Sequence, residues 1–182
     1  PFQTFFCYFT EMRIKDLGLI DYAEADALQL RTVEQVVSGG EETVFLLEHP
    51  PVITLGRSGD RSNLLVDEAL LRDRGVGLHH STRGGNITCH FPGQLVVYPI
   101  LRLERRPGGV RQFFSDLEQV VINSLSRYSV SSQRQNGLTG VFVEGRKIAS
   151  MGVAVKKWVS RHGLSFNIGR NLELFSLITG CG

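Results

Sequence analysis

Apolar residues recur every three or four positions in two segments, and this spacing is typical of amphipathic helices. Residues 22–38 follow an acidic cap at Asp21 and precede Gly39, so a helix is predicted there. A shorter helix is predicted over residues 67–74, where Gly75 ends it. A third helix is predicted over residues 110–128, whose apolar stripe consists of Val110, Phe113, Leu117, Val121 and Leu125.

Short apolar runs bounded by glycine, proline or polar residues predict strands. A hairpin is expected to turn at Gly145-Arg146, and the glycine-rich segment that begins at Ser81 is expected to be a loop feeding a strand. Strands outnumber helices and come in hairpins rather than strand–helix–strand units. We therefore predict an α/β or α+β fold with a mixed, largely antiparallel sheet flanked by helices. The predicted strands cover residues 13–20, 43–47, 52–55, 94–100, 140–144, 147–155 and 164–168.

Composition narrows the classes of function. The chain has 182 residues, enough for one domain with a core, and its formal charge of +2 without a long basic run argues against a nucleic-acid partner. No apolar run approaches the roughly 20 residues of a membrane helix, so no membrane partner is expected. An odd set of 3 cysteines favours the reducing cytoplasm over a disulfide framework.

Several segments carry candidate chemistry, although each also has an ordinary structural interpretation. Cys181 stands between two glycines, where a thiol can be exposed as a nucleophile, or it is incidental to the chain end. Lys147 enters an apolar strand, where its amine must be paired or must reach water. His79, His80, Cys89 and His90 invite a zinc site, but their spacing matches no strong pattern, so no metal is predicted.

Six motifs in a fixed order give the sequence a specific resemblance. They are Leu-Glu-His-Pro at 47–50, Thr-Leu-Gly-Arg at 54–57, Arg-Gly-Gly-x-x-Thr-x-His at 83–90 with Pro-Gly-Gln at 92–94, Lys-x-x-x-x-Gly at 147–152, His-Gly at 162–163 and Cys-Gly at 181–182. Together they resemble the lipoyl(octanoyl) transferase family within the biotin/lipoate protein ligase fold. The likeness runs from about Met12 to the end of the chain.

The resemblance implies an acyltransferase that moves an octanoyl or lipoyl group to a specific lysine of its acceptor and needs no cofactor. Cys181 matches the cysteine that carries the acyl thioester, and Lys147 matches the lysine that lowers the pKa of that thiol and moves protons. The donor would be octanoyl-acyl carrier protein, and the acceptors would be lipoyl domains of 2-oxoacid dehydrogenase complexes and the glycine cleavage H protein. The implied acyl-binding residues are Arg83, Gly84, Gly85, Asn86, Ile87, Thr88, Cys89, His90, Ser150, Met151, Gly152, Gly163, Leu164 and Ser165.

The sequence also departs from the family pattern. Cys89 stands where the family has an aromatic residue, and Phe91 stands where it has a glycine, so these two residues are expected to reshape the acyl pocket. Gly180 stands where the family has a proline, which is expected to loosen the loop that carries Cys181. Family members continue beyond their cysteine. We therefore expect residues 12–182 to form a catalytic domain that is truncated after Cys181. Residues 1–11 are expected to be an extension that need not be native. We also expect the last residues to be mobile and catalysis by this chain to be weak.

Two further expectations concern substrate binding. We expect an apolar groove whose floor is formed by Gly84, Gly85 and Gly152, because a Cβ at these positions would block the path of the acyl chain. Acidic partner proteins are expected to dock on local basic groups, namely Arg105, Arg106 and Arg111, and Lys156, Lys157 and Arg161.

Two alternatives to the transferase remain open at this point. An ATP-dependent lipoate or biotin ligase of the same fold would not need a cysteine in a terminal loop. A non-catalytic module that binds carrier proteins would not need to retain both Lys147 and Cys181.

Overall fold

The described part of the chain starts with a strand–helix–strand unit. The computed structural model describes residues 12–104 and 106–179, so the predicted extension at residues 1–11 lies outside it. β1 (Arg13–Leu19) and β2 (Thr43–Glu48) pair in parallel, and α1 (Tyr22–Val37) connects them. The prediction that strands occur only in hairpins was therefore wrong here, because a helix of this length lets the chain return to the same end of the sheet.

Within the described residues the main sheet has seven strands in the order β1-β2-β6-β10-β9-β8-β7. Only β1 and β2 are parallel, so the predicted mixed, largely antiparallel sheet is confirmed. The hairpin turns at Glu144 and Gly145, which have φ of 49° and 77°, one residue earlier than predicted. The other strands are β6 (Gln94–Ile100), β7 (Gln133–Gln135), β8 (Leu138–Val143), β9 (Arg146–Lys156) and β10 (Val159–Asn167).

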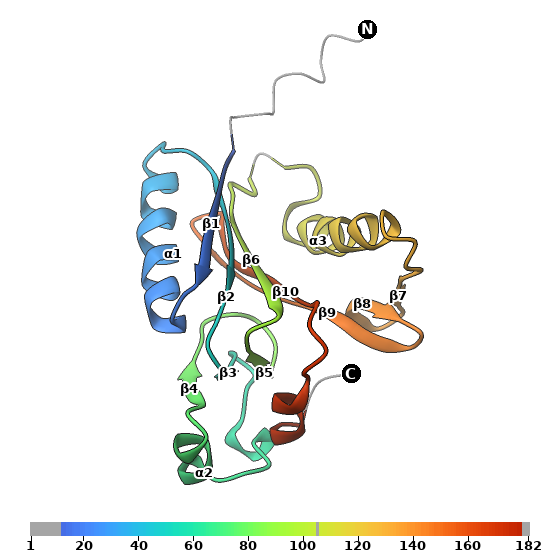
Figure 1. The fold of residues 1–182 in the computed structure, drawn as a ribbon. Helices are drawn as coiled ribbons and strands as arrows, with labels where there is room; N and C mark the ends of the chain where they lie inside the picture. The colour runs from blue at the N-terminus through green and yellow to red at the C-terminus, as the bar shows by residue number, and fades with distance from the viewer. Residues whose placement is uncertain (1–11, 105, 180–182) are drawn as a thin grey trace, which may run out of the picture.

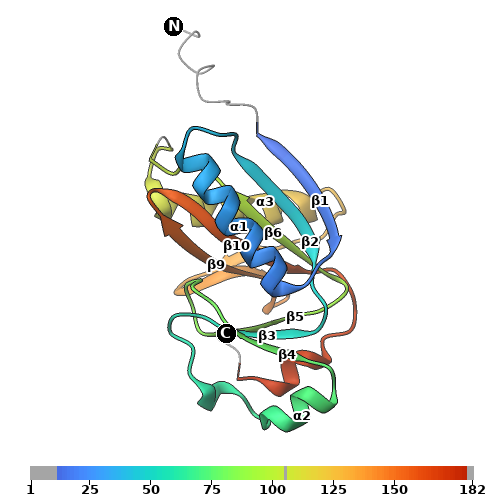
Figure 2. The same cartoon turned by 90° about the vertical axis from the view of Figure 1, so that its left-hand side faces the viewer.

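The two long helices cover opposite faces of this sheet, as Figures 1 and 2 show. Asp21 caps α1 as predicted, since its carboxylate accepts backbone N–H groups of the first turn. Buried residues of α1 pack with Phe45, Leu47 and Tyr98 on one face. The predicted stripe of α3 (Gly109–Ser126) packs with Val141 and Leu164 on the other. Helical spacing in the sequence therefore located both halves of the core.

A smaller sheet of order β4-β3-β5 lies at one end of the main sheet (Figure 1). β3 (Val52–Leu55) pairs in parallel with β4 (Gly77–His80) after α2 (Glu68–Asp73) and antiparallel with β5 (Ile87–His90). β4 and β5 were not predicted, because each has only four residues and shows no clear alternation of apolar and polar side chains. Two 3₁₀ turns, η1 (Arg61–Asn63) and η2 (Glu173–Leu177), complete this end.

Candidate active site

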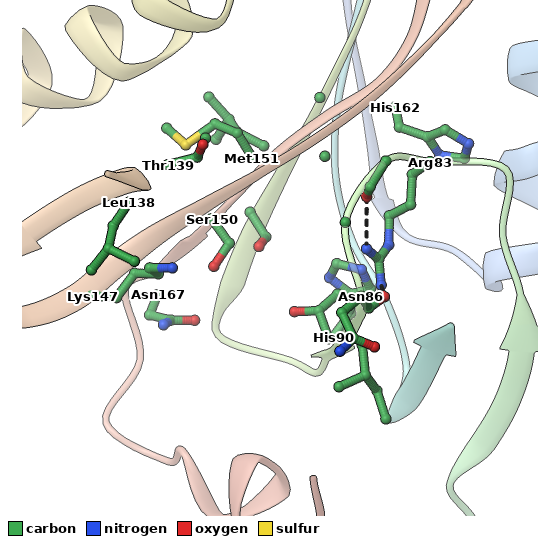
Figure 3. A pocket seen from close by; sticks show the side chains of 18 of the residues that line it. Arg83, Asn86, His90, Leu138, Thr139, Lys147, Ser150, Met151, His162 and Asn167 are labelled. Carbon is green, nitrogen blue, oxygen red and sulfur yellow. Dashed lines mark hydrogen bonds between the residues drawn. The ribbon is translucent and has the colours of Figure 1, made fainter. Parts of the chain in front are cut away.

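A cavity of about 840 Å³ lies where the β4–β5 loop, strands β9 and β10, and the segment around η2 meet (Figure 3). Its size suits a small organic ligand. Nearly all the acyl-binding residues expected from the sequence line it. Those that do are Arg83, Gly84, Gly85, Asn86, Ile87, Thr88, His90, Ser150, Met151, Gly152, Gly163, Leu164 and Ser165.

The apolar part of the cavity wall comes from four elements that are distant in sequence. Phe114 projects from α3, Leu138 from β8, and Met151 and Leu164 from β9 and β10. The segment 168–179 adds a further side with Leu172, Phe175 and Ile178. An unbranched hydrocarbon chain can be buried against such a wall, whereas a charged ligand would lose its hydration there.

Lys147 lines the same cavity, from the wall opposite Arg83 (Figure 3). It follows the tight turn at Gly145, and its Nζ lies 5.4 Å from the centre of the Phe142 ring. This contact is within the range of a cation–π interaction. The structure thus brings Lys147 together with Gly84 and Gly85, whereas the chemical role of Lys147 stays a prediction.

Arg83 acts as a clamp on the β4–β5 loop. It is 8% exposed, and its guanidinium donates to the main-chain oxygens of Thr54, Gly84 and Asn86 at 2.7, 3.1 and 3.0 Å. It also donates to Thr54 Oγ1 from Nε at 3.1 Å and from Nη2 at 2.9 Å. The planar fork of arginine therefore fixes the loop to β3, a task that a lysine cannot reproduce.

Close packing of the β4–β5 loop against β9 explains the need for a glycine at position 152. Gly84 donates its N–H to Val153 O at 3.0 Å, so the loop lies directly against β9. A Cβ on Gly152 would come within 3.2 Å of Gly84 O and of Arg83 Cδ. Gly85 has φ of +83°, a conformation that favours glycine. These glycines allow the close approach of loop and strand, so the expected reason, an open path for the acyl chain, was wrong for Gly152.

Cys89 is the exception among the expected acyl-binding residues. Its side chain is 0% exposed and packs with Ile53 and Leu71 in the core of the small sheet, away from the cavity lining. Burial raises the pKa of the thiol to about 12. Phe91 also points away and meets the Phe175 ring edge-on at 5.7 Å. Neither departure from the family pattern therefore reshapes the pocket directly, although Phe91 supports a wall residue.

The expected mobility of the chain end concerns Gly180 and Cys181, which lie outside the described residues. The residues just before them are well anchored. Ile178 forms an antiparallel bridge with Leu64, and Thr179 N donates to Asn63 O at 2.8 Å. Ile178 also lines the cavity, so the described part of the chain ends beside it.

A cluster of buried imidazole and phenol rings lies beside the clamp. His49 bonds to Tyr98 Oη at 2.9 Å, and the rings of Tyr22 and His90 stack at 6.2 Å. Burial lowers the pKa of both His90 and His162 to about 3. These histidines are therefore neutral at physiological pH, and they can accept or donate hydrogen bonds without acting as cations.

Sequence reasoning missed several residues of this site. Tyr22 and Tyr98 also line the cavity, as does Asn167, and the buried Gln94 holds Asn167 in place. Gln94 is 0% exposed. A polar side chain in an otherwise apolar strand was the available signal, since such residues are buried only when they have hydrogen-bond partners.

The expected basic docking groups are largely engaged within the protein. Arg161 is 7% exposed and bonds to Asp26, so its assignment to a docking surface was wrong. Lys156 pairs with Glu34 at 2.6 Å and Arg106 with Glu42 at 2.9 Å. Arg105 lies outside the described residues.

Two further findings concern metal ions and membranes. Among residues 12–104 and 106–179 the structure holds no cluster of three or more histidine, cysteine or acidic side chains that could bind a metal. Within the same residues, no helix is both long and apolar enough to cross a membrane.

Comparison with known proteins places this fold and cavity in a family. The model of the lipoyl protein ligase A/B catalytic domain matches residues 21–181. An octanoyltransferase of Nitratidesulfovibrio vulgaris (strain DSM 19637 / Miyazaki F) is 57% identical over 171 residues, covering 94% of this chain and 78% of that protein. An octanoyltransferase of Maridesulfovibrio salexigens is 48% identical over 172 residues, covering 94% and 80%.

A solved structure agrees at the level of the fold. Protein Ta0514 from T. acidophilum, with bound lipoic acid, superposes with a TM-score of 0.74 at 16% identity, covering 92% of this chain and 73% of that one. This chain belongs to the lipoyl protein ligase A/B catalytic-domain family. The family and the fold predicted from the ordered motifs are confirmed.

Proposed function

We propose that this protein is an octanoyltransferase, which moves an octanoyl group from acyl carrier protein to Cys181 and then to a lysine of a lipoyl domain. Relatives at 57% and 48% identity bear the name octanoyltransferase, which supports this class of acyltransferase. One structural observation carries the proposed site. Lys147 and the expected acyl-binding segments, which are far apart in sequence, line a single cavity beside the segment that leads to Cys181.

The proposed site requires Cys181 to reach Lys147. Cys181 follows Thr179 by two residues, and two residues of extended chain span at most about 7 Å. Thr179 is anchored to Asn63, and the preceding Ile178 lines the cavity that Lys147 also lines. The anchored segment therefore supports a nucleophile at the cavity.

The first half-reaction forms a thioester on the enzyme. The Lys147 amine takes the proton of the Cys181 thiol, and the resulting thiolate attacks the carbonyl carbon of the donor thioester. Collapse of the tetrahedral intermediate breaks the bond to the carrier sulfur. The departing carrier thiolate takes the proton back from the Lys147 ammonium, so no charge accumulates.

The second half-reaction forms the amide. A neutral lysine amine of the lipoyl domain attacks the octanoyl carbonyl carbon, and the bond to Cys181 Sγ breaks. One amine proton passes through Lys147 to the departing thiolate, which restores the starting enzyme. Thioester exchange is close to balanced in energy and amide formation is favourable, so this route requires no ATP.

The apolar wall supports the choice of a medium-length acyl group. Burial of each methylene contributes about 0.8 kcal/mol, so the seven carbons beyond the carbonyl would contribute about 6 kcal/mol. The wall residues Phe114, Met151 and Leu164 are suited to this contact because they carry no charge.

The test is transfer from octanoyl-carrier protein to an isolated lipoyl domain without ATP. We expect octanoyl-amide formation and no release of AMP, whereas a ligase would require ATP and release AMP. The Lys147→Ala variant should transfer slowly at neutral pH and recover partly at high pH, because hydroxide can then remove the thiol proton. Lys15→Ala is a matched control, since Lys15 is an exposed lysine on the edge strand β1 and does not line the cavity. Equal rates for Lys147→Ala and wild type would refute the role of Lys147.

A further inference from the structure

Asn167 occupies the open end of the β9–β10 ladder, next to Lys147. The register pairs Phe166 with Ala149, so Asn167 and Lys147 both lie just beyond this pair. The position opposite Asn167 is that of Ile148, and Lys147 follows one residue further along β9. Both residues line the cavity, and Figure 3 draws them on the same side of it, across from Arg83. Asn167 therefore stands where the proposed thiol chemistry would occur.

Buried hydrogen bonds determine which way the Asn167 amide is oriented. Gln94 Nε2 lies 3.3 Å from Cys89 O and 2.9 Å from Asn167 Oδ1. A main-chain oxygen can only accept, so the amide nitrogen of Gln94 must face Cys89. The same nitrogen then donates to Asn167, whose oxygen must face Gln94. The two N–H donors of the Asn167 amide are consequently directed elsewhere.

The hydrogen bond between His90 and Gln94 agrees with this orientation of the Gln94 amide. Gln94 Oε1 accepts from His90 Nδ1 at 2.6 Å, so the neutral His90 ring carries its proton on Nδ1. Gln94 is 0% exposed and His90 is 5% exposed, so water does not compete for these bonds. Gln94 also pairs directly with Asn167 between β6 and β10. His90 and Gln94 thus position the Asn167 amide.

We propose that the Asn167 Nδ2 group donates a hydrogen bond to the acyl carbonyl oxygen and stabilises its negative charge in the transition state. This inference rests on the proposed function of the same cavity. When Cys181 Sγ bonds to the carbonyl carbon, the π electrons move to the oxygen, and the Asn167 N–H shortens its contact to that oxyanion. The electrons return to the carbonyl when the carrier sulfur departs. No proton leaves Asn167, and the same donor serves the second half-reaction.

The donor is useful because it is fixed before the substrate arrives. An amide that must rotate or shed water to meet the oxyanion would lose much of its effect, whereas one held by Gln94 does not need to move. Removal of one such donor typically costs about 10²–10³-fold in rate. The ordinary alternative is that Asn167 only satisfies Gln94 at the end of a strand, in which case its N–H groups have no role in catalysis.

Three variants separate these possibilities. Asn167→Asp keeps the shape and the oxygen that accepts from Gln94 but removes the N–H donor. Asn167→Ala removes both. Gln94→Glu lacks the donor that orients Asn167, so the Asn167 amide should turn and present its oxygen to the cavity.

Two single-turnover reactions of Cys181 should be compared in each variant. Octanoylation by octanoyl-carrier protein passes through an oxyanion, whereas alkylation by iodoacetamide at the same thiol does not. We expect octanoylation to fall by about 100-fold or more in each variant. The rate and pH profile of alkylation should be unchanged in Asn167→Ala. In Asn167→Asp the new carboxylate raises the thiol pKa, so the two reactions of that variant are compared at a pH where the thiol is fully ionised. A merely structural role would change both reactions together.

The outcomes are distinct. Octanoylation of Asn167→Asp at the wild-type rate would overturn the inference, and so would a parallel loss of alkylation in all three variants. If the wild-type protein forms no octanoyl-Cys181 adduct, the proposed function itself fails. An adduct on wild type that forms equally fast on Asn167→Ala would leave the transferase intact and remove only the role of Asn167.

Discussion

The Arg83 clamp makes a quantitative prediction about stability as well as activity. Arg83→Lys keeps the positive charge but loses the planar fork that bonds to Thr54, Gly84 and Asn86. Because Arg83 is 8% exposed, the oxygens left without a donor cannot all be solvated. Each buried oxygen left without its donor costs about 1–3 kcal/mol, so the loss of two such donors costs about 4 kcal/mol.

Urea unfolding followed by circular dichroism measures this loss. With a denaturant slope of about 2 kcal/mol per M, the midpoint of Arg83→Lys should fall by roughly 2 M. Arg57→Lys is the matched control, because Arg57 lies close by on an exposed part of the chain, and its midpoint should not move. If Arg83→Lys unfolds at the wild-type midpoint but transfers no octanoyl group, Arg83 contacts the substrate instead and the clamp interpretation is wrong.

Three other predictions follow from the same contacts. Gly163→Ala should fold poorly, because its Cβ would lie 2.2 Å from Val97 O, and a thermal melt equal to wild type would contradict the tight β6–β10 approach. His90 and His162 have a pKa of about 3 in the folded protein, below the 6.5 of an unfolded chain, so the unfolded chain binds more protons as the pH falls. Lowering the pH from 7.5 to 5 should therefore reduce the free energy of unfolding by about 2 kcal/mol for each of these histidines. Urea titrations at both pH values should show a correspondingly smaller loss for His90→Gln and His162→Gln. Shortening the donor acyl chain by two carbons should lower kcat/KM about 15-fold through lost burial, and equal rates for hexanoyl and octanoyl donors would argue against an apolar acyl site.

The sequence predicted those parts of the molecule that depend on local patterns. The stripe of α3 and the Asp21 cap of α1 were correct because each depends on residues within a few turns. The ordered motifs also indicated that Lys147 and the segment from Arg83 to His90 belong together, and they line one cavity. Short motifs that bear glycine and charge carry this information even where secondary structure is ambiguous.

Long-range pairings were not predictable in the same way. The partner of Arg83 is Thr54, 29 residues earlier in the chain, and only the folded β3 brings it within reach. Cys89 was assigned to the acyl site by its position in a motif, but the strand alternation of β5 turns its side chain into the core. Asn167 gains its orientation from Gln94, 73 residues away, and no local pattern signals such a bond.

The central claim is that the octanoyl group is carried on Cys181, and intact mass spectrometry tests it most directly. The protein should be mixed with octanoyl-carrier protein without acceptor, quenched in acid to preserve the thioester, and digested to map the adduct. We predict a mass increase of one octanoyl group on the peptide that contains Cys181, removed by neutral hydroxylamine and absent in Cys181→Ala. Transfer to a lipoyl domain by Cys181→Ala, or an adduct on Cys89 instead, would contradict the account.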